Sequence, residues 1–209
     1  MLKNTISKNF DDEVKINAGN LISKKYSIIN CDVTNPELLQ SKFKELDINF
    51  SNLTIVLGEC LFVYIEKDLT INLLKSLTAN FDNLVLFLYD LVGNNDNFGR
   101  EMEYNLMQRN IKIPGLNQVP DTKAQINRLI DSNFSEAKVV DMLQYYRKYI
   151  SKSEKSRIEK LEFLDELEEF NLSQKHSCFG CAIKINKDNE NIQLDELKKI
   201  IEELKKENN

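Results

Sequence analysis

The sequence predicts an α/β protein with a parallel sheet, and three observations support this prediction. Short apolar segments, which are typical of buried strands, lie at residues 26–31, 53–57 and 84–88. Segments in which leucine recurs at helical spacing separate these strands. Acidic or polar residues close each strand. Strands that alternate with helices in this way pair in parallel through right-handed crossovers.

The first elements follow in chain order. Residues 1–24 are polar, and we expect them to be irregular. Strand 26–31 comes next. A helix then begins near Pro36, with Thr34 or Asn35 as its cap, because proline is favoured in the first turn of a helix.

A helix over residues 67–80 separates the second and third strands, and turn-forming residues follow Asp90. Beyond that turn the pattern predicts, in order, helices 98–110 and 122–131, a strand 137–141, helices 142–149 and 154–170, a strand 176–185 and a peripheral helix 194–206. We expect the acidic helix 154–170 to brace the sheet, and all 209 residues to form one domain.

Residues 53–64 form the most informative segment. The apolar run Leu53–Leu57 predicts a buried strand, Gly58 lets the backbone turn, and Glu59 follows where the strand should end. Ligands bind outside the carboxyl ends of strands in open α/β sheets, so Glu59 is a candidate to accept hydrogen bonds from a sugar hydroxyl or an amine. Tyr64 would face the same pocket. Alternatively, Glu59 caps the next helix.

Composition and charge exclude several classes of protein. The net charge is -5 and lysines are mixed with acids, so a nucleic-acid-binding surface is not expected. No apolar run reaches the roughly 18 residues that cross a bilayer, and no apolar signal core follows Met1. We therefore expect a cytoplasmic protein that does not bind membranes. One histidine and four scattered cysteines leave few ligands for a metal, and none is expected.

Polar groups at three strand ends point to a nucleoside-like ligand. Asp32, Glu59 and the pair Tyr89–Asp90 would lie in a row along one edge of the sheet. One acid can bind ribose hydroxyls, and another can contact an adenine edge. The chain contains neither G-x-G-x-x-G nor a phosphate-binding G-x-x-x-x-G-K, so the ligand lacks a polyphosphate or its glycine-rich loop lies outside this chain.

Several motifs resemble those of the leucine carboxyl methyltransferases. The segment Glu59–Tyr64 matches the E-C-x-x-x-Y box of that family. Further matches follow in the same order over residues 21–186, at 96–102, at Asn105 and Leu106, at 140–142, in the eleven-residue run 156–166, and at His176, Cys178 and Ala182. Several motifs in the same order are far more specific than any one of them.

The resemblance implies an S-adenosylmethionine-dependent methyltransferase with a Rossmann-like, mostly parallel sheet. Its members transfer a methyl group to the C-terminal leucine carboxylate of the protein phosphatase 2A catalytic subunit, which is thus the implied partner. No general base is needed, because a C-terminal carboxyl with a pKa of roughly 3.5 is already ionised at pH 7. Accordingly no catalytic side chain is assigned.

Site residues carry over from the family one at a time. Asp32 and Val33 match the pair that frames the adenine, and Glu59 with Cys60 matches the cofactor-contacting box. Tyr64 matches the tyrosine that faces the substrate carboxylate. Tyr89, at the next strand end, is assigned to the substrate as well. Alternatively, Asp32 is a helix cap and Tyr64 is a core tyrosine.

The resemblance also implies an N-terminal helical region, an arginine near the methyl donor, a glycine-containing loop after the first strand and an acid after the second. None of these occurs in this chain. We therefore expect an N-terminally truncated member of the family. We expect the complete protein to be a monomer. With the family's strand order 3-2-1-4-5-7-6, residues 26–31 would be strand three and 53–57 strand four. Strand three would then lack its neighbours, or would pair directly with strand four.

Two other functions remain open. The chain is a non-catalytic fragment or regulator that binds the phosphatase or a partner chain, or it methylates another class of substrate on the same fold. Two smaller signals favour structural roles. The Cys178-x-x-Cys181 pair is expected to pack in the core, and His176 is not expected to be a general base. Residues 98–100 lie beside the active-site entrance or simply pack at a helix start.

Overall fold

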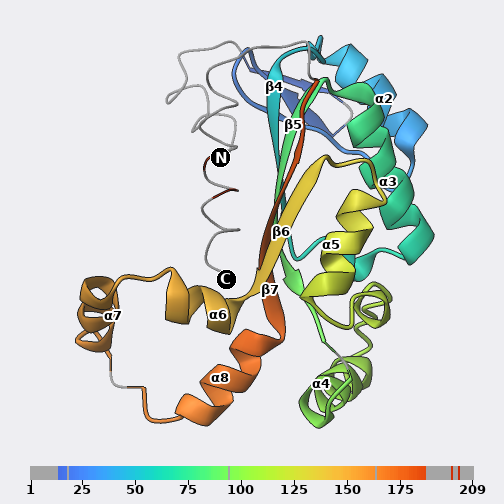
Figure 1. Ribbon diagram of the computed structural model, residues 1–209. Helices are drawn as coiled ribbons and strands as arrows, with labels where there is room; N and C mark the ends of the chain where they lie inside the picture. The colour runs from blue at the N-terminus through green and yellow to red at the C-terminus, as the bar shows by residue number, and fades with distance from the viewer. Residues whose placement is uncertain are drawn as a thin grey trace. The chain divides into compact units, whose positions relative to one another are not determined.

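Figure 1 shows the computed structural model of the chain, which describes residues 14–17, 19–93, 95–162 and 164–186 together with Lys199 and Glu202. Two compact units make up the chain, residues 1–48 and residues 49–209, and each is described by itself. Of the predicted tail helix 194–206, only Lys199 and Glu202 are described, and both are helical.

The first unit contains a small antiparallel sheet that the sequence did not predict. Its strands β1 (Lys15–Asn17), β2 (Asn20–Ile22) and β3 (Ser27–Ile28) pair in the order β1-β2-β3. Residues 1–24 are therefore not irregular throughout, and the prediction that residues 26–31 form a strand of the parallel sheet is wrong. The reason is local: Ser23 bonds to the carbonyl of Tyr26, and this tight turn folds β3 back onto β2.

A single helix, α2 (Pro36–Glu45), completes the described part of the first unit and confirms the predicted helix. Asn35 is its cap, because the Asn35 side chain accepts a hydrogen bond of 3.0 Å from the amide of Leu38. Thr34 instead donates its hydroxyl to Asp32.

The second unit is built on a four-stranded sheet with the order β4-β5-β7-β6. The strands are β4 (Leu53–Glu59), β5 (Asn83–Leu91), β6 (Glu136–Asp141) and β7 (Ser177–Lys184). This order matches the last four strands of the order expected from the resemblance. Only β4 and β5 pair in parallel, because β7 runs in the opposite direction between β5 and β6. Strands β4, β5 and β6 therefore run in one direction and β7 opposes them, so the sheet is mixed, with β4 and β5 as its parallel pair.

Helices and two short 3-10 turns connect these strands. The predicted helices at 67–80, 98–110, 122–131 and 142–149 are confirmed with small changes of boundary. The elements are η1 (Phe62–Tyr64), α3 (Lys67–Asn80), α4 (Asn97–Gln108), η2 (Leu116–Gln118), α5 (Thr122–Ile130), α6 (Met142–Lys148), α7 (Lys152–Glu159) and α8 (Leu167–Lys175). Within the described ranges, none of these helices combines the length and apolar character needed to cross a membrane.

The single helix predicted over residues 154–170 is wrong, because α7 ends at Glu159 and α8 begins only at Leu167. Carboxylates three and four residues apart, at Glu162, Asp165 and Glu166, would repel one another on a continuous helix. The first turn of α8 instead contains Glu168 and Glu169, where acids are favoured by the helix dipole. Most of α7 and α8 is exposed, so α7 does not brace the sheet as predicted.

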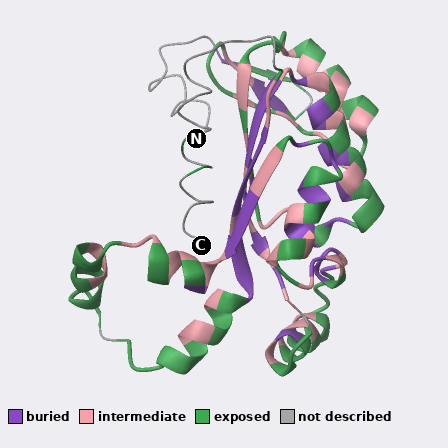
Figure 2. Cartoon of the chain, viewed as in Figure 1, coloured by how far each residue is buried: buried purple, intermediate pink, exposed green. Residues whose placement is uncertain are grey.

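The core surrounds β5, which Figure 2 shows as the most buried part of the sheet together with β7. Successive side chains of a strand point to opposite faces. Leu84, Leu86 and Leu88 therefore share the face that α3 and α5 cover in Figure 1. On the other face, Val85 packs in a cluster with Cys181 and its neighbours.

Strand β4 is more exposed than its apolar sequence predicts. Ile55 and Leu57 are 56% and 75% exposed, on the face opposite to the helices. Among the described residues β4 pairs only with β5, so it forms an edge of the sheet. An exposed apolar edge strand tends to pair with other chains. The strand predicted at 53–57 is therefore confirmed, but it is not buried as its apolar sequence predicts.

We expect self-association through this edge, and Leu57→Lys should reduce it because charged side chains on an edge strand oppose pairing. Sedimentation velocity should show a shift toward monomer, while the unfolding free energy changes by no more than about 0.5 kcal/mol. As the control, Leu86→Lys at a fully buried position of β5 should prevent folding. A monodisperse monomer of the unaltered chain at high concentration would contradict the expectation.

Candidate functional site

The carboxyl ends of β4 and β5 bring three of the predicted site residues together. Glu59 is the last residue of β4 and lies opposite Tyr89 in the parallel register. The amide of Cys60 donates a hydrogen bond of 2.7 Å to the carbonyl of Tyr89. The exposed carboxylate of Glu59 makes no hydrogen bond or ion pair within the described residues, so it is available to a ligand.

The sequence predicted that the backbone turns at Gly58. In the structure it turns at Cys60 instead. Cys60 has a φ of 46°, in the left-handed region, whereas Gly58 is still part of the strand. Gly58 is needed for a different reason, since a Cβ there would lie 2.7 Å from the ring of Phe62. We call residues 59–64 the strand-tip turn.

Tyr64 ends the strand-tip turn and is 54% exposed, so it is not a core tyrosine. Glu59 is not a helix cap either, because its side chain makes no hydrogen bond to the first-turn amides of η1 or α3. Both alternatives to a ligand-facing role are therefore wrong. The carboxylate that does bond to a backbone amide of the turn is that of Asp90. Its Oδ2 accepts a hydrogen bond of 3.1 Å from the amide of Val63.

Asp90 is only 2% exposed and lies on the helix-covered face, opposite to Glu59 and Tyr89. Its Oδ1 accepts the amide of Leu91 at 2.9 Å. Burial raises the pKa of Asp90 to about 6, although the hydrogen bond from Leu91, the charge of Arg128 and the hydrogen bond from Val63 oppose the shift.

Sequence reasoning missed Arg128, which is 8% exposed on α5. Its guanidinium lies 5.4 Å from the centroid of the Phe62 ring. Burial lowers the pKa of Arg128, while the negative charge of Asp90 opposes that change. An arginine on an amphipathic helix usually lies at the surface, and no signal in the sequence distinguished this one.

Asp32 and Val33, the predicted adenine-framing pair, belong to the first unit. Oδ1 of Asp32 accepts the amide and the hydroxyl of Thr34, at 2.9 and 2.8 Å. These hydrogen bonds lower the pKa of the exposed Asp32 carboxyl. Asp32 thus closes the turn before α2 rather than capping the helix, and its role toward a ligand stays a prediction.

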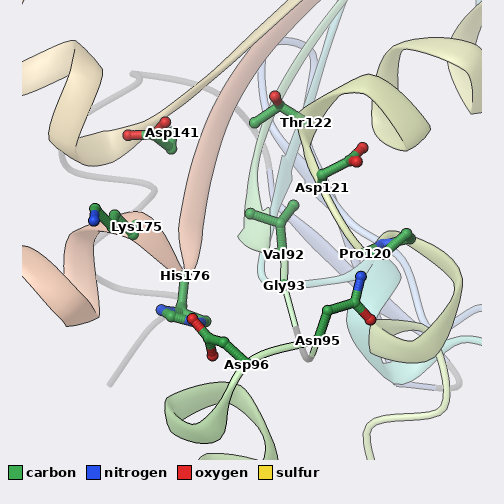
Figure 3. A pocket seen from close by; sticks show the side chains of 10 residues that line it. All are labelled: Val92, Gly93, Asn95, Asp96, Pro120, Asp121, Thr122, Asp141, Lys175 and His176. Atoms are coloured by element: carbon green, nitrogen blue, oxygen red, sulfur yellow. The ribbon is translucent and has the colours of Figure 1, made fainter.

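A pocket of about 310 Å³ opens at the same edge of the sheet, and none of the six predicted site residues lines it. Figure 3 shows its lining: Val92, Gly93, Asn95, Asp96, Pro120, Asp121, Thr122, Asp141, Lys175 and His176. Its three carboxylates already have a structural role as helix caps. Asp96, Asp121 and Asp141 cap α4, α5 and α6 respectively.

His176 is buried beside this pocket and both of its ring nitrogens have partners. Nδ1 lies 2.7 Å from the carbonyl oxygen of Leu172, and Nε2 lies 3.0 Å from Oδ1 of Asp96, as Figure 3 illustrates. Both partners are acceptors, so the ring nitrogen that carries a proton decides which contact is a hydrogen bond. This arrangement connects α8 to the start of α4 and agrees with a structural role.

The Cys178-x-x-Cys181 pair packs in the core, as predicted. Both cysteines are free and buried in β7, and burial raises their pKa values to about 12 and about 11. These thiols therefore stay protonated and unreactive. Among the described residues, no group of three or more histidines, cysteines or acids is arranged to hold a metal ion.

Comparison with known proteins confirms the resemblance inferred from the motifs. The chain is 32% identical to leucine carboxyl methyltransferase 1 of Rattus norvegicus over 174 residues, which are 83% of the chain and 52% of the relative. It is 33% identical to the Schizosaccharomyces pombe enzyme of that name over 176 residues, 84% of the chain and 56% of the relative. The chain thus spans about half the length of the curated relatives it matches.

A second kind of relative shares the same region. The chain is 27% identical to tRNA wybutosine-synthesizing protein 4 of Rattus norvegicus over 154 residues, 74% of the chain and 22% of that protein. No family model matches the chain.

Among solved structures, a candidate methyltransferase from Thermobifida fusca aligns with a TM-score of 0.52 at 14% identity. The alignment covers 75% of this chain and 53% of the other. At this identity the likeness shows the α/β fold alone.

The buried carboxyl of Asp90 should make the stability of the chain depend on pH. Because its pKa rises from 3.8 to about 6, the folded chain binds a proton between these pH values that the unfolded chain does not. Its stabilising contribution is fully present below about pH 3.8 and is lost as the pH rises through about 6. Relative to Asp90→Asn, the unaltered chain should gain about 2 kcal/mol of unfolding free energy between pH 7 and pH 4.

Urea unfolding of both proteins across this range measures the difference directly. Two parallel stability profiles would show that Asp90 does not titrate in this window.

Proposed function

On the premise that this chain is a homologue of leucine carboxyl methyltransferase 1, we propose that it contributes to S-adenosylmethionine-dependent methylation of a C-terminal leucine carboxylate. The proposed substrate is the protein phosphatase 2A catalytic subunit. The observation that carries the proposal is the unpaired Glu59 carboxylate, held at the strand tip inside the matched Glu59–Tyr64 box. We further propose that the chain is the C-terminal portion of a methyltransferase domain.

The residues of the strand-tip turn suit the cofactor. The exposed Glu59 carboxylate can accept hydrogen bonds from ribose hydroxyls, and Cys60 beside it has its backbone fixed by Tyr89. Asp32 and Val33 are proposed to frame the adenine. When bound, S-adenosylmethionine supplies an activated methyl group.

Tyr64 and Tyr89 are proposed to contact the substrate. The Tyr64 hydroxyl is exposed and can donate a hydrogen bond to a carboxylate oxygen. No described residue has to remove a proton, because the substrate carboxylate is already ionised near pH 7. Catalysis would come from holding the carboxylate close to the methyl group and from excluding water. A cation to receive the carboxylate is proposed to come from the part of the relatives that this chain does not span.

A second candidate function has its own supporting observation. The tRNA wybutosine-synthesizing protein 4 of rat matches 74% of the chain, and its name refers to tRNA rather than to a leucine carboxyl group. A substrate other than a protein C-terminus would then replace the leucine carboxylate. The higher identity to leucine carboxyl methyltransferase 1 favours the first candidate.

Methyl transfer can be measured with the chain alone and with the N-terminal half of the rat relative added in trans. With tritium-labelled S-adenosylmethionine, we expect base-labile label on the phosphatase catalytic subunit, because a carboxyl methyl ester hydrolyses in mild base. The same subunit without its last leucine is the control and should stay unlabelled. Phosphatase binding without any label under either condition would favour a regulator instead.

Glu59→Ala should weaken cofactor binding without unfolding the protein. A hydrogen bond to a charged group contributes about 1.5–3 kcal/mol, so the Kd of S-adenosylhomocysteine should rise about tenfold to a hundredfold. Glu66→Ala is the matched control, because Glu66 is also exposed and its side chain makes no capping hydrogen bond. Calorimetry, or titration by NMR where binding is weak, gives the Kd. Unchanged binding together with a lower Tm would rule out the ligand-facing role.

A further inference from the structure

The strand-tip turn is held mainly from the side opposite to its exposed residues. The amide of Val63 donates to Asp90 from within the turn, and the carbonyl of Val63 accepts the amide of Gly115 at 2.9 Å. The backbone of Gly115 lies so close that a Cβ there would overlap the carbonyl of Phe62. The turn is therefore clamped between β5 and the loop before η2.

The side chain of Phe62 extends this clamp to α5. Phe62 is 2% exposed, its ring lies against Gly58, and the guanidinium of Arg128 lies over its face. The Nε and Nη2 atoms of Arg128 are buried and have no hydrogen-bond partner among the described residues. Burying these nitrogens without partners is unfavourable, and the negative charge of Asp90 opposes that effect.

Asp90 and Arg128 are the two charged side chains among these buried groups, and burying a charge is unfavourable for folding. Replacing such a pair by apolar residues is often neutral or stabilising. Asp90 and Arg128 nevertheless both act on the segment that presents Glu59 and Tyr64. Asp90 bonds to the backbone of that segment, and the guanidinium of Arg128 lies over its Phe62 ring. Their placement therefore points to a role in the shape of the turn.

We propose that Asp90 and Arg128 are positioning residues that fix the strand-tip turn from the helix-covered face of the sheet. Asp90 holds the turn by accepting backbone amides, and Arg128 keeps that carboxylate charged and packs on Phe62. Their effect on ligand binding rests on the function proposed above for the turn. Their effect on the shape of the turn does not.

Protonation of Asp90 should loosen this clamp, since a neutral carboxyl is a weaker acceptor than a carboxylate. The charged or titratable groups that act on Asp90 or are affected by it are Arg128 on α5, Cys178 on β7 and Cys60 in the turn. Burial keeps the pKa of both thiols raised, so neither is ionised near neutral pH. Arg128 is therefore the one facing charge among these groups.

Amide NMR of the unaltered chain tests the clamp without any variant. The amide resonances of Cys60, Val63 and Leu91 should titrate together with a midpoint of about 6. Arg128→Met, which keeps the apolar stem, should move that midpoint upward, because the cation opposes protonation of Asp90. Arg109→Met, an exposed arginine at the end of α4, is the control and should leave it unchanged. Amides that do not titrate together would overturn the proposal.

Hydrogen exchange measures how firmly Asp90 holds the turn. In Asp90→Asn the amide of Val63 should exchange about tenfold faster, because a hydrogen bond to a charged acceptor is replaced by one to a neutral amide. Asp141→Asn is the matched control, since this carboxylate at the end of β6 caps α6 and does not contact the turn. Equal protection of Val63 in Asp90→Asn and the unaltered chain would overturn the proposal.

The affinity for S-adenosylhomocysteine gives a readout that a purely structural role would not move. It should fall several-fold below about pH 6 in the unaltered chain, and this fall should be absent in Asp90→Asn. A fall of the same size in both proteins would overturn the positioning role. If S-adenosylhomocysteine does not bind at any pH, the proposed function fails, while the amide titration and the exchange rates still decide whether Asp90 holds the turn.

Discussion

A buried carboxylate beneath the tips of two parallel strands is the constraint on which the rest of the site depends. Asp90 is removed from water on the helix-covered face, and it offsets that loss by accepting the amides of Val63 and Leu91. Because β4 and β5 are in parallel register, the turn after β4 passes directly over it. The backbone of the turn that presents Glu59 and Tyr64 is thus bonded to a buried group on the other face of the sheet.

The same arrangement divides the sheet into two faces with different tasks. The face with Leu84, Leu86 and Leu88 is covered by helices and carries the charged clamp. The opposite face presents Leu57, and the side chains of Glu59 and Tyr89 follow at its edge. The turn proposed to bind the cofactor therefore lies beside an exposed apolar surface of β4.

The sequence predicted the second unit well and the first unit poorly. Continuous apolar runs and helical leucine spacing placed β4, α3, β5 and α5 to within a few residues, because packing in a sheet layer leaves a strong pattern. The strands β1–β3 are two or three residues long and depend on turns, so they carry no such pattern. The direction of β7 could not be read either, since an apolar run is the same in parallel and antiparallel strands.

Within the candidate site, the residues proposed to face a ligand were easier to select from the sequence than those that support them. Glu59 follows a predicted strand and lies in a matched motif, and both features selected it as a candidate site residue. Asp90 was noted only as one more polar residue at a strand end, and Arg128 of α5 was not singled out at all. Their burial and their contact with the turn depend on how distant segments pack, which no local pattern encodes.

Chemical-shift mapping with S-adenosylhomocysteine tests the central claim most directly, because it reports where a ligand binds even at low affinity. The account predicts that perturbed amides cluster at the carboxyl ends of β4 and β5, around Cys60, Tyr64 and Tyr89. Perturbations confined to the pocket around Asp96 and His176, or no perturbation at saturating ligand, would contradict it.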